Sequence, residues 1–123
     1  MKKTILIIED EAPLRDALVS KLNLEGFFTF EAKNGEEGLA IALDKCPDLI
    51  LLDIIMPKMD GITLLRNLRQ NEKCKKTEVI MLTNLDDMNK VAEAVEQDSS
   101  EYLVKSNIKI EDVVLKVRAK LGV

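Results

Sequence analysis

The sequence contains no histidine and no tryptophan among its 123 residues, and only 3% of its residues are aromatic. The absence of histidine removes the commonest general base and a frequent zinc ligand, and it excludes a histidine phosphocarrier. No apolar run approaches the length of a membrane span, and residues 5–8 are too short an apolar run for a signal peptide. We therefore expect a cytoplasmic protein without a membrane partner.

Cysteine is also scarce, since Cys46 and Cys74 are far apart in the sequence and no Cys-x-x-Cys pair occurs. We expect two reduced thiols, because neither a metal-binding nor a redox motif is present. The net charge of -4 lacks the basic excess that phosphate binding requires, so we expect no direct contact with nucleic acid. A charged fraction of 33% beside a hydrophobic fraction of 46% is typical of a globular protein, and we expect one domain over residues 1–123.

Strand and helix patterns alternate along the whole chain. Apolar runs predict strands at 4–8, 27–32, 49–52, 78–83 and 102–104. Apolar residues at helical spacing predict a helix after each strand, and we place Ala17, Ala40 and Ala92 on the buried stripes. Five such pairs imply a flavodoxin-like, doubly wound α/β fold, (βα)5, with a five-stranded parallel sheet in the order 2-1-3-4-5.

Polar side chains stand where the predicted strands end: Glu9 and Asp10, Asp53, Thr83 and Lys105. The carboxyl ends of parallel strands share one edge of the sheet, and strands 1 and 3 adjoin in this order, so Asp10 and Asp53 should face each other. Carboxylates from two strands suit Mg²⁺, and an Asp in such a site can attack a phosphoryl group. Lys105 and Thr83 would contact other phosphoryl oxygens. Each feature alone is common, and their convergence at one edge supports the hypothesis.

Four segments together resemble the receiver domain of two-component response regulators. They are Ile-Ile-Glu-Asp-Glu at 7–11, Leu-Leu-Asp-Ile-Ile-Met-Pro-Lys-Met-Asp-Gly at 51–61, Met-Leu-Thr at 81–83 and Tyr-Leu-Val-Lys at 102–105. The resemblance covers essentially the whole chain. It implies that Asp53 accepts a phosphoryl group from a histidine kinase or phosphotransfer protein. It also implies a Mg²⁺ ion bound by Asp10, Asp53 and the backbone carbonyl of Ile55, with Glu9 acting through water.

The same resemblance implies a conformational switch formed by Thr83 and Tyr102. In the family the hydroxyl moves toward the phosphoryl group and the aromatic ring turns inward, which alters the surface made by the fourth helix, the fifth strand and the fifth helix. We expect this surface to control binding of a downstream protein or of a second phosphorylated copy. The protein is then a signalling switch and not an enzyme, since it promotes only its own phosphorylation and dephosphorylation.

Several positions depart from the usual pattern of that family. Ser106 follows Lys105 where proline commonly follows a cis bond, so either a non-proline cis bond is retained or the loop runs differently. Asp98-Ser99 replaces a common Gly-Ala, from which we expect the fourth helix to fray at its end. Ile55 and Leu85 flank the site with apolar bulk, and we expect slow loss of the phosphoryl group because attacking water would be poorly held.

Other functions fit the sequence less well. A phosphorylation-independent binding module on the same fold would not need an intact Asp53, Thr83 and Lys105. A Mg-dependent aspartyl phosphohydrolase of the haloacid dehalogenase type needs a second Asp where Ile55 stands, and it needs a cap domain. A flavin carrier needs a Ser/Thr/Gly-rich loop after the first strand, where three acids would repel the phosphate. The initiating Met and compact ends favour a complete single-domain regulator over an excised domain.

Overall fold

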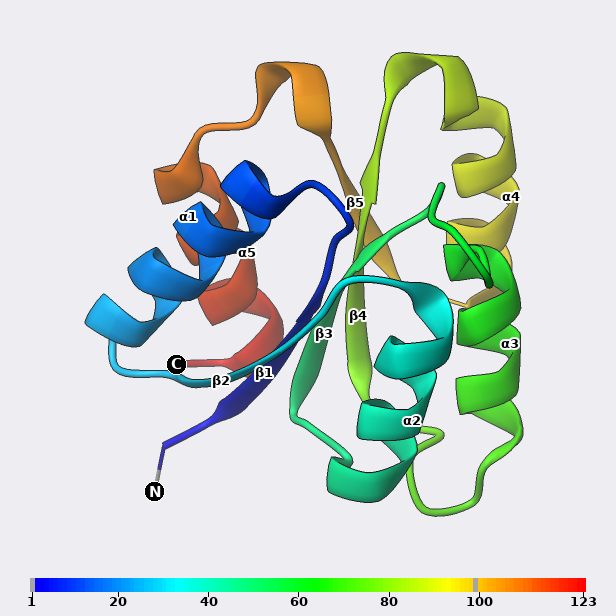
Figure 1. Ribbon diagram of the computed structural model, residues 1–123, viewed down its shortest axis with the longest axis horizontal. Helices are drawn as coiled ribbons and strands as arrows, with labels where there is room; N and C mark the ends of the chain where they lie inside the picture. The colour runs from blue at the N-terminus through cyan, green and yellow to red at the C-terminus, as the bar shows by residue number, and fades with distance from the viewer. Residues whose placement is uncertain (1, 99) are drawn as a thin grey trace.

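The computed structural model describes residues 2–98 and 100–123, and it contains one sheet between two layers of helices (Figure 1). The strands are β1 Thr4–Ile8, β2 Phe28–Ala32, β3 Leu49–Asp53, β4 Glu78–Thr83 and β5 Glu101–Val104. The helices are α1 Ala12–Leu24, α2 Gly35–Lys45, α3 Gly61–Gln70, α4 Met88–Asp98 and α5 Ile110–Leu121, with short 3-10 helices η1 Leu85–Asp87 and η2 Lys105–Asn107. All strand pairs are parallel, in the order β2-β1-β3-β4-β5. The predicted fold class and strand order are confirmed.

The core consists of two apolar layers, one on each face of the sheet. Helices α2, α3 and α4 cover one face, and α1 and α5 cover the other (Figure 1). Successive residues of β1 alternate between the layers, since Leu6 packs in the first and Ile7 in the second. Because both faces are covered, the central strands are buried throughout, which explains their continuous apolar sequence. Among the described helices, none is long and apolar enough to cross a membrane.

Side-chain caps fix where two helices begin beside the carboxyl edge of the sheet. The Asn34 Oδ1 atom accepts a hydrogen bond of 2.8 Å from the backbone N–H of Glu37 at the start of α2. The Asp60 Oδ1 atom accepts one of 2.8 Å from the N–H of Thr63 at the start of α3. Such caps satisfy N–H groups that have no partner within the helix. The loop between β3 and α3 therefore ends at a defined residue.

The placement of three alanines on buried stripes is wrong, because Ala17, Ala40 and Ala92 are all exposed. The buried positions of α2 are instead Gly35, Gly38 and Ala42. At Gly38 a Cβ atom would lie 2.6 Å from Ile8 Cδ1, so this helix packs closer to the sheet than any side chain at that position permits. Exposing the single methyl group of alanine costs little apolar burial, so helical spacing alone does not decide its side.

The expectation of two reduced thiols is also wrong for this structure, in which Cys46 and Cys74 form a disulfide. Cys46 follows the last residue of α2, and Cys74 lies in the loop between α3 and β4. Their Cα atoms are 5.4 Å apart, within the usual range for a disulfide. Distance along the sequence did not reveal this contact, because the tertiary fold brings the two segments together.

The structure describes the chain at two positions that depart from the family pattern, the Lys105-Ser106 bond and the end of α4. Every peptide bond in the described part of the chain is trans, and the residues after β5 form η2 at Lys105–Asn107. The loop after Lys105 thus follows the second of the two expected courses. At the end of α4 the Asp98 carboxylate is held by Arg69, with 2.6 Å between Arg69 Nε and Asp98 Oδ1. Ser99, where fraying was expected, lies outside the described residues.

Candidate functional site

The strand order brings three acidic side chains together at the carboxyl edge of the sheet. Strands β1 and β3 are neighbours, with Ile8 opposite Leu52, so the residues that follow each of them are adjacent. One carboxylate oxygen from each of Glu9, Asp10 and Asp53 lies within 4.8 Å of the other two. The predicted juxtaposition of these carboxylates is therefore present in the structure.

Lys105 extends from the end of β5 into this acidic cluster. Its Nζ atom lies 2.7 Å from Glu9 Oε1, 3.3 Å from Asp53 Oδ2 and 3.3 Å from Glu11 Oε1. Only 7% of the side chain is exposed. The lysine consequently provides the central positive charge among four carboxylates, three of which it contacts directly.

Burial divides these carboxylates into two kinds. Glu9 and Asp53 are buried, at 0% and 3% exposure, whereas Asp10 is exposed. Burial raises the pKa of Asp53 from 3.8 to about 8, helped by hydrogen bonding to Glu9 and by its charge, and opposed by the charge of Lys105. Burial lowers the pKa of Lys105, but its contact with Glu9 and the charge of Asp53 outweigh this effect and leave the pKa raised. Unless a cation binds in addition to Lys105, ionisation of Asp53 is energetically unfavourable.

The donor set suits a small divalent cation. Glu9 Oε1 is buried and, within the described part of the chain, accepts no hydrogen bond, although it forms an ion pair with Lys105. Asp10 leaves its carboxylate exposed at the mouth of the cluster. Carboxylate oxygens with room for water are the ligands that Mg²⁺ prefers. Glu9, Asp10 and Asp53 therefore fit this ion by charge and by ligand type.

Among the described residues, the other predicted site residues form no hydrogen bond or ion pair with the side chains of the cluster. Thr83, at the end of β4, is 1% exposed, and its hydroxyl donates to the backbone carbonyl of Asn84 at 3.0 Å. Tyr102 lies in β5 with 38% of its surface exposed, and it pairs with Met81 in the sheet rather than with Thr83. Ile55 is 48% exposed in the loop after β3. The side chain of Leu85 lies outside the described part of the structure.

Sequence reasoning gave no role to two residues that support the acidic cluster. Glu11 contacts Lys105, and its backbone N–H donates to Glu9 Oε2 at 3.2 Å. Arg15, one turn into α1, donates from Nη1 to the backbone carbonyl of Glu9 at 2.8 Å. The position of Arg15 one helical turn after the acidic run was the available signal.

Two glycines hold the loop that follows Asp53, and sequence reasoning gave neither a role in the site. A Cβ atom on Gly61 would lie 2.5 Å from the backbone oxygen of Asp53, and one on Gly35 would overlap the backbone oxygen of Met59. The N–H of Gly61 also donates to the carbonyl of Ile54 at 2.8 Å. The first residues of α2 and of α3 therefore both lie in close contact with the backbone at Asp53 and in the loop after it. Glycine at these two positions permits the contact because it has no Cβ atom.

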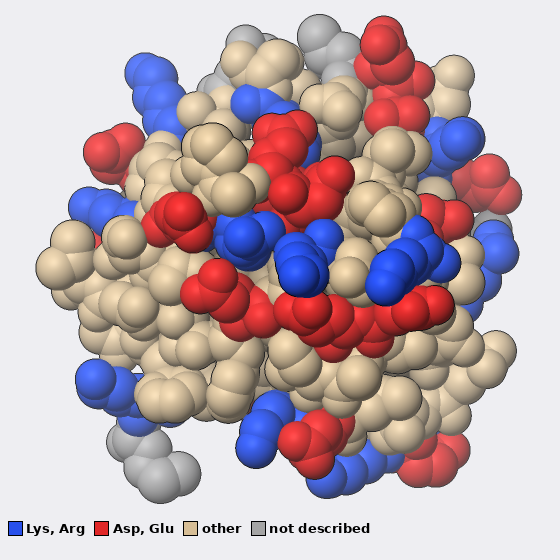
Figure 2. Space-filling view, in the orientation of Figure 1, with Lys and Arg blue, Asp and Glu red and all other residues tan. Residues whose placement is uncertain are grey.

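The surface charge is mixed in sign. Figure 2 shows Lys and Arg side chains in a band across the middle of one face, with Asp and Glu side chains gathered directly above and below it. The net charge of the chain is -4. This face therefore does not present the continuous basic surface that binds a phosphate backbone.

Comparisons with known proteins agree on one family. The model of the response regulator receiver domain matches residues 5–118. The phosphate regulon transcriptional regulatory protein PhoB of Pseudomonas aeruginosa is 37% identical over 84% of this chain and 45% of its own length. The transcriptional regulatory protein SrrA of Staphylococcus aureus is 37% identical over 98% of this chain and 48% of its own. This chain thus spans about half the length of these relatives.

Solved structures show the same similarity. The receiver domain of the Francisella response regulator 1452 has a TM-score of 0.87 at 28% identity, with 98% of each chain covered. The receiver domain of a signal transduction histidine kinase from Syntrophus aciditrophicus has a TM-score of 0.86 at 31% identity, covering 98% of this chain and 90% of that one. Sequence and structure comparisons thus point to one family.

Proposed function

This chain belongs to the response regulator receiver domain family, and we propose that it is a phosphorylation-controlled signalling switch with Asp53 as phosphoacceptor. The observation that supports this role is the buried Asp53 carboxylate, held beside Glu9 and Asp10 and 3.3 Å from the Lys105 ammonium. The phosphoryl donor is a sensor histidine kinase or a phosphotransfer protein. We place the protein in the cytoplasm, where such donors present their phosphorylated histidine.

The proposed reaction is a phosphoryl transfer to a carboxylate. An Asp53 oxygen attacks the phosphorus atom, the P–N bond of the phosphohistidine breaks, and its electron pair leaves with the imidazole. Glu9 acting through water, Asp10, Asp53 and the Ile55 carbonyl would hold Mg²⁺, which supplies positive charge to the carboxylates and to the phosphoryl oxygens. Lys105 Nζ already lies 3.3 Å from Asp53 Oδ2, which suits contact with one of those oxygens.

Thr83 and Tyr102 are the proposed switch. The Thr83 hydroxyl now donates to the carbonyl of Asn84, and a phosphoryl group on Asp53 would offer it a charged acceptor instead. Its movement would leave space for the ring of Tyr102, now 38% exposed, to turn inward. The surface of α4, β5 and α5 would then change, and with it the binding of a downstream protein or a second copy of this chain.

Intact mass after treatment with acetyl phosphate and Mg²⁺ tests this proposal. We expect a gain of about 80 Da, one phosphoryl group, in the wild type. The matched control is Asp60→Asn, which removes a carboxylate from the same loop but keeps a side chain that can cap α3. It should gain the same mass, whereas Asp53→Asn should gain none.

Omission of Mg²⁺ completes the experiment. Without the ion the wild type should gain no mass, because the charge on Asp53 is then uncompensated. Absence of an adduct under every condition would overturn the proposal and favour a phosphorylation-independent binding module. Equal labelling of Asp53→Asn and the wild type would show that another residue is modified.

A further inference from the structure

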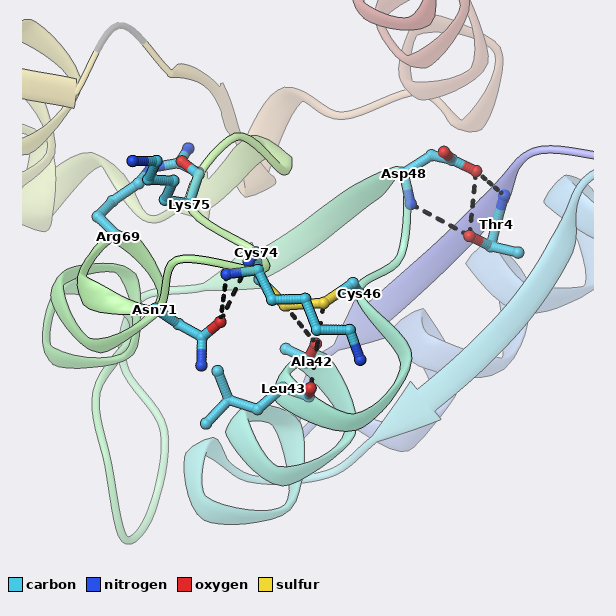
Figure 3. Close-up of a disulfide and its surroundings, with 10 residues drawn as sticks. Thr4, Ala42, Leu43, Cys46, Asp48, Arg69, Asn71, Cys74 and Lys75 are labelled. Atoms are coloured by element: carbon cyan, nitrogen blue, oxygen red, sulfur yellow. Dashed lines mark hydrogen bonds between the residues drawn. A yellow bond between two sulfur atoms is a disulfide. The ribbon is translucent and has the colours of Figure 1, made fainter.

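A disulfide joins two segments at the edge of the molecule that is formed by the amino ends of the strands. Cys46 follows α2 in a left-handed conformation, with φ of 42°, and it is half-buried. Cys74 lies in the loop 71–77 and is only 1% exposed. Figure 3 shows the sulfur atoms meeting between the last turn of α2 and this loop. The pair is remote from the acidic cluster, which lies at the carboxyl ends of the strands.

The surroundings of the pair provide partners for reduced thiols as well. Cys74 Sγ lies 3.5 Å from the backbone oxygen of Ala42, and Cys46 Sγ lies 4.0 Å from that of Leu43 (Figure 3). Both carbonyls belong to the last turn of α2, and that of Ala42 also accepts a hydrogen bond from the backbone N–H of Cys46 at 2.9 Å. On reduction the two sulfur atoms must move apart, and a thiol at either position can then donate to the neighbouring carbonyl. The site therefore accommodates both the dithiol and the disulfide.

The loop 71–77 is built around Cys74. The Asn71 Oδ1 atom accepts hydrogen bonds from the backbone N–H of Lys73 at 2.9 Å and from that of Cys74 at 3.2 Å. The carbonyl of Cys74 accepts from the N–H of Thr77 at 3.1 Å. A change in the bonding of Cys74 therefore alters the hydrogen bonds that fix the conformation of the whole loop.

Arg69 connects this loop to the end of α4. Its Nη1 atom donates to the carbonyls of Lys75 and Thr77 at 2.9 and 2.6 Å. Its Nε and Nη2 atoms donate to the two carboxylate oxygens of Asp98 at 2.6 and 2.9 Å. We call these four hydrogen bonds the Arg69 clamp. A bidentate arginine–carboxylate pair of this kind fixes orientation as well as distance.

Packing between α3 and α4 leaves space beside the clamp. A hollow of about 480 Å³ lies between α3 and α4. Its walls include Ile62, Leu65 and Ala94, and the clamped residues Arg69 and Asp98 also line it. Side chains that face a hollow lose the dispersion contacts that would otherwise hold the two helices together. The polar clamp therefore joins α3 to Asp98, the last residue of α4.

We propose that Cys46 and Cys74 are a redox-responsive modification site, and that their oxidation state controls α4 through the loop 71–77 and the Arg69 clamp. The oxidant is a low-molecular-weight disulfide such as oxidised glutathione. One S–S bond forms in the protein as that of the oxidant breaks, and the two protein thiols give two electrons and two protons to the reagent, which becomes two thiols. Reduction begins at Cys46, since it is the more exposed of the two sulfur-bearing residues.

Thiol counting tests the modification without any phosphodonor or Mg²⁺, so its outcome is separate from that of the phosphorylation proposal. The native protein is equilibrated with glutathione mixtures of increasing oxidised fraction, then alkylated and weighed. We expect a two-electron conversion from two alkylated thiols to none. The single variants Cys46→Ser and Cys74→Ser should each keep one alkylatable thiol or form a mixed disulfide with glutathione. Two free thiols in every mixture, or a disulfide that reduced glutathione and dithiothreitol open only in denaturant, would overturn the proposal.

Hydrogen exchange of the backbone amides of α4 tests the connection. We expect exchange at the C-terminal end of α4 to be several-fold faster in the reduced protein than in the oxidised protein. Arg69→Gln should abolish this redox difference, while Arg66→Gln, on the same helix but outside the clamp, should preserve it. Equal exchange in both redox states, or a difference that survives Arg69→Gln, would overturn the connection to α4.

Discussion

Asp53 combines two properties that oppose each other in the absence of a metal ion. Its carboxylate must be ionised to act as a nucleophile, yet it is 3% exposed and lies beside two other acids. Burial raises its pKa to about 8. A bound cation would therefore favour the ionised form of Asp53. Without a cation, ionisation of Asp53 is unfavourable, and a neutral side chain at this position would remove that cost.

We expect Asp53→Asn to stabilise the metal-free protein at alkaline pH. The pKa of Asp53 rises from 3.8 in the unfolded chain to about 8 in the folded protein, so folding favours the protonated form. The free energy of unfolding of the wild type should therefore fall as the pH rises through this window, whereas the variant lacks the titrating group. Between about pH 4.5 and about pH 8.5 the variant should gain about 4 kcal/mol relative to the wild type.

Urea unfolding in the presence of a chelator measures this difference, with Asp60→Asn as the control that should show no such trend. Mg²⁺ should stabilise the wild type more than Asp53→Asn, because the ion removes the repulsion that the substitution already relieves. A stability difference between Asp53→Asn and the wild type that does not change with pH would contradict the assigned cause.

Ile55 should slow the loss of the phosphoryl group. Its side chain is 48% exposed beside the phosphoacceptor and offers no hydrogen bond to an attacking water molecule. Ile55→Asn supplies such a partner, and one added hydrogen bond in the transition state corresponds to roughly 2–10-fold faster hydrolysis. The decay of the 80 Da adduct over time, about the mass of one phosphoryl group, is the measurement. Ile55→Val keeps the apolar character and should decay like the wild type; faster decay of both variants would point to altered packing instead.

At the scale of elements, the start of α2 positions the loop after β3. Gly35→Ala should destabilise the protein by about 2 kcal/mol, because the new Cβ atom overlaps the backbone oxygen of Met59 and must displace the loop. Since that loop carries Ile55, the affinity for Mg²⁺ should also fall, by about tenfold. Isothermal titration with Mg²⁺ measures the affinity. Glu36→Ala, at the neighbouring exposed position, is the control, and an unchanged affinity in Gly35→Ala would show that the loop does not depend on α2.

The elements were largely predictable because their signals are local. Strand order followed from the alternation of strands and helices and from the crossover rules. The contacts that sequence reasoning missed are tertiary. The Cys46–Cys74 disulfide and the ion pair between Arg69 and Asp98 join residues far apart in the sequence, and no short motif predicts either contact. Alanine at helical spacing was misplaced because exposing its single methyl group costs little apolar burial.

At the scale of the whole molecule, charge limits what this chain can bind alone. Several relatives are transcriptional regulators about twice its length, but its net charge is -4 and the face in Figure 2 alternates acidic and basic bands. Neutralising phosphates releases counterions only where Lys and Arg form a continuous surface. We therefore expect no mobility shift of duplex DNA by up to about 10 µM protein in about 50 mM salt, conditions that favour non-specific binding. A DNA-binding relative is the positive control. Binding that weakens steeply with salt would reveal a basic surface elsewhere on the molecule, whereas its absence in both phosphorylation states would direct the search for an output toward protein partners.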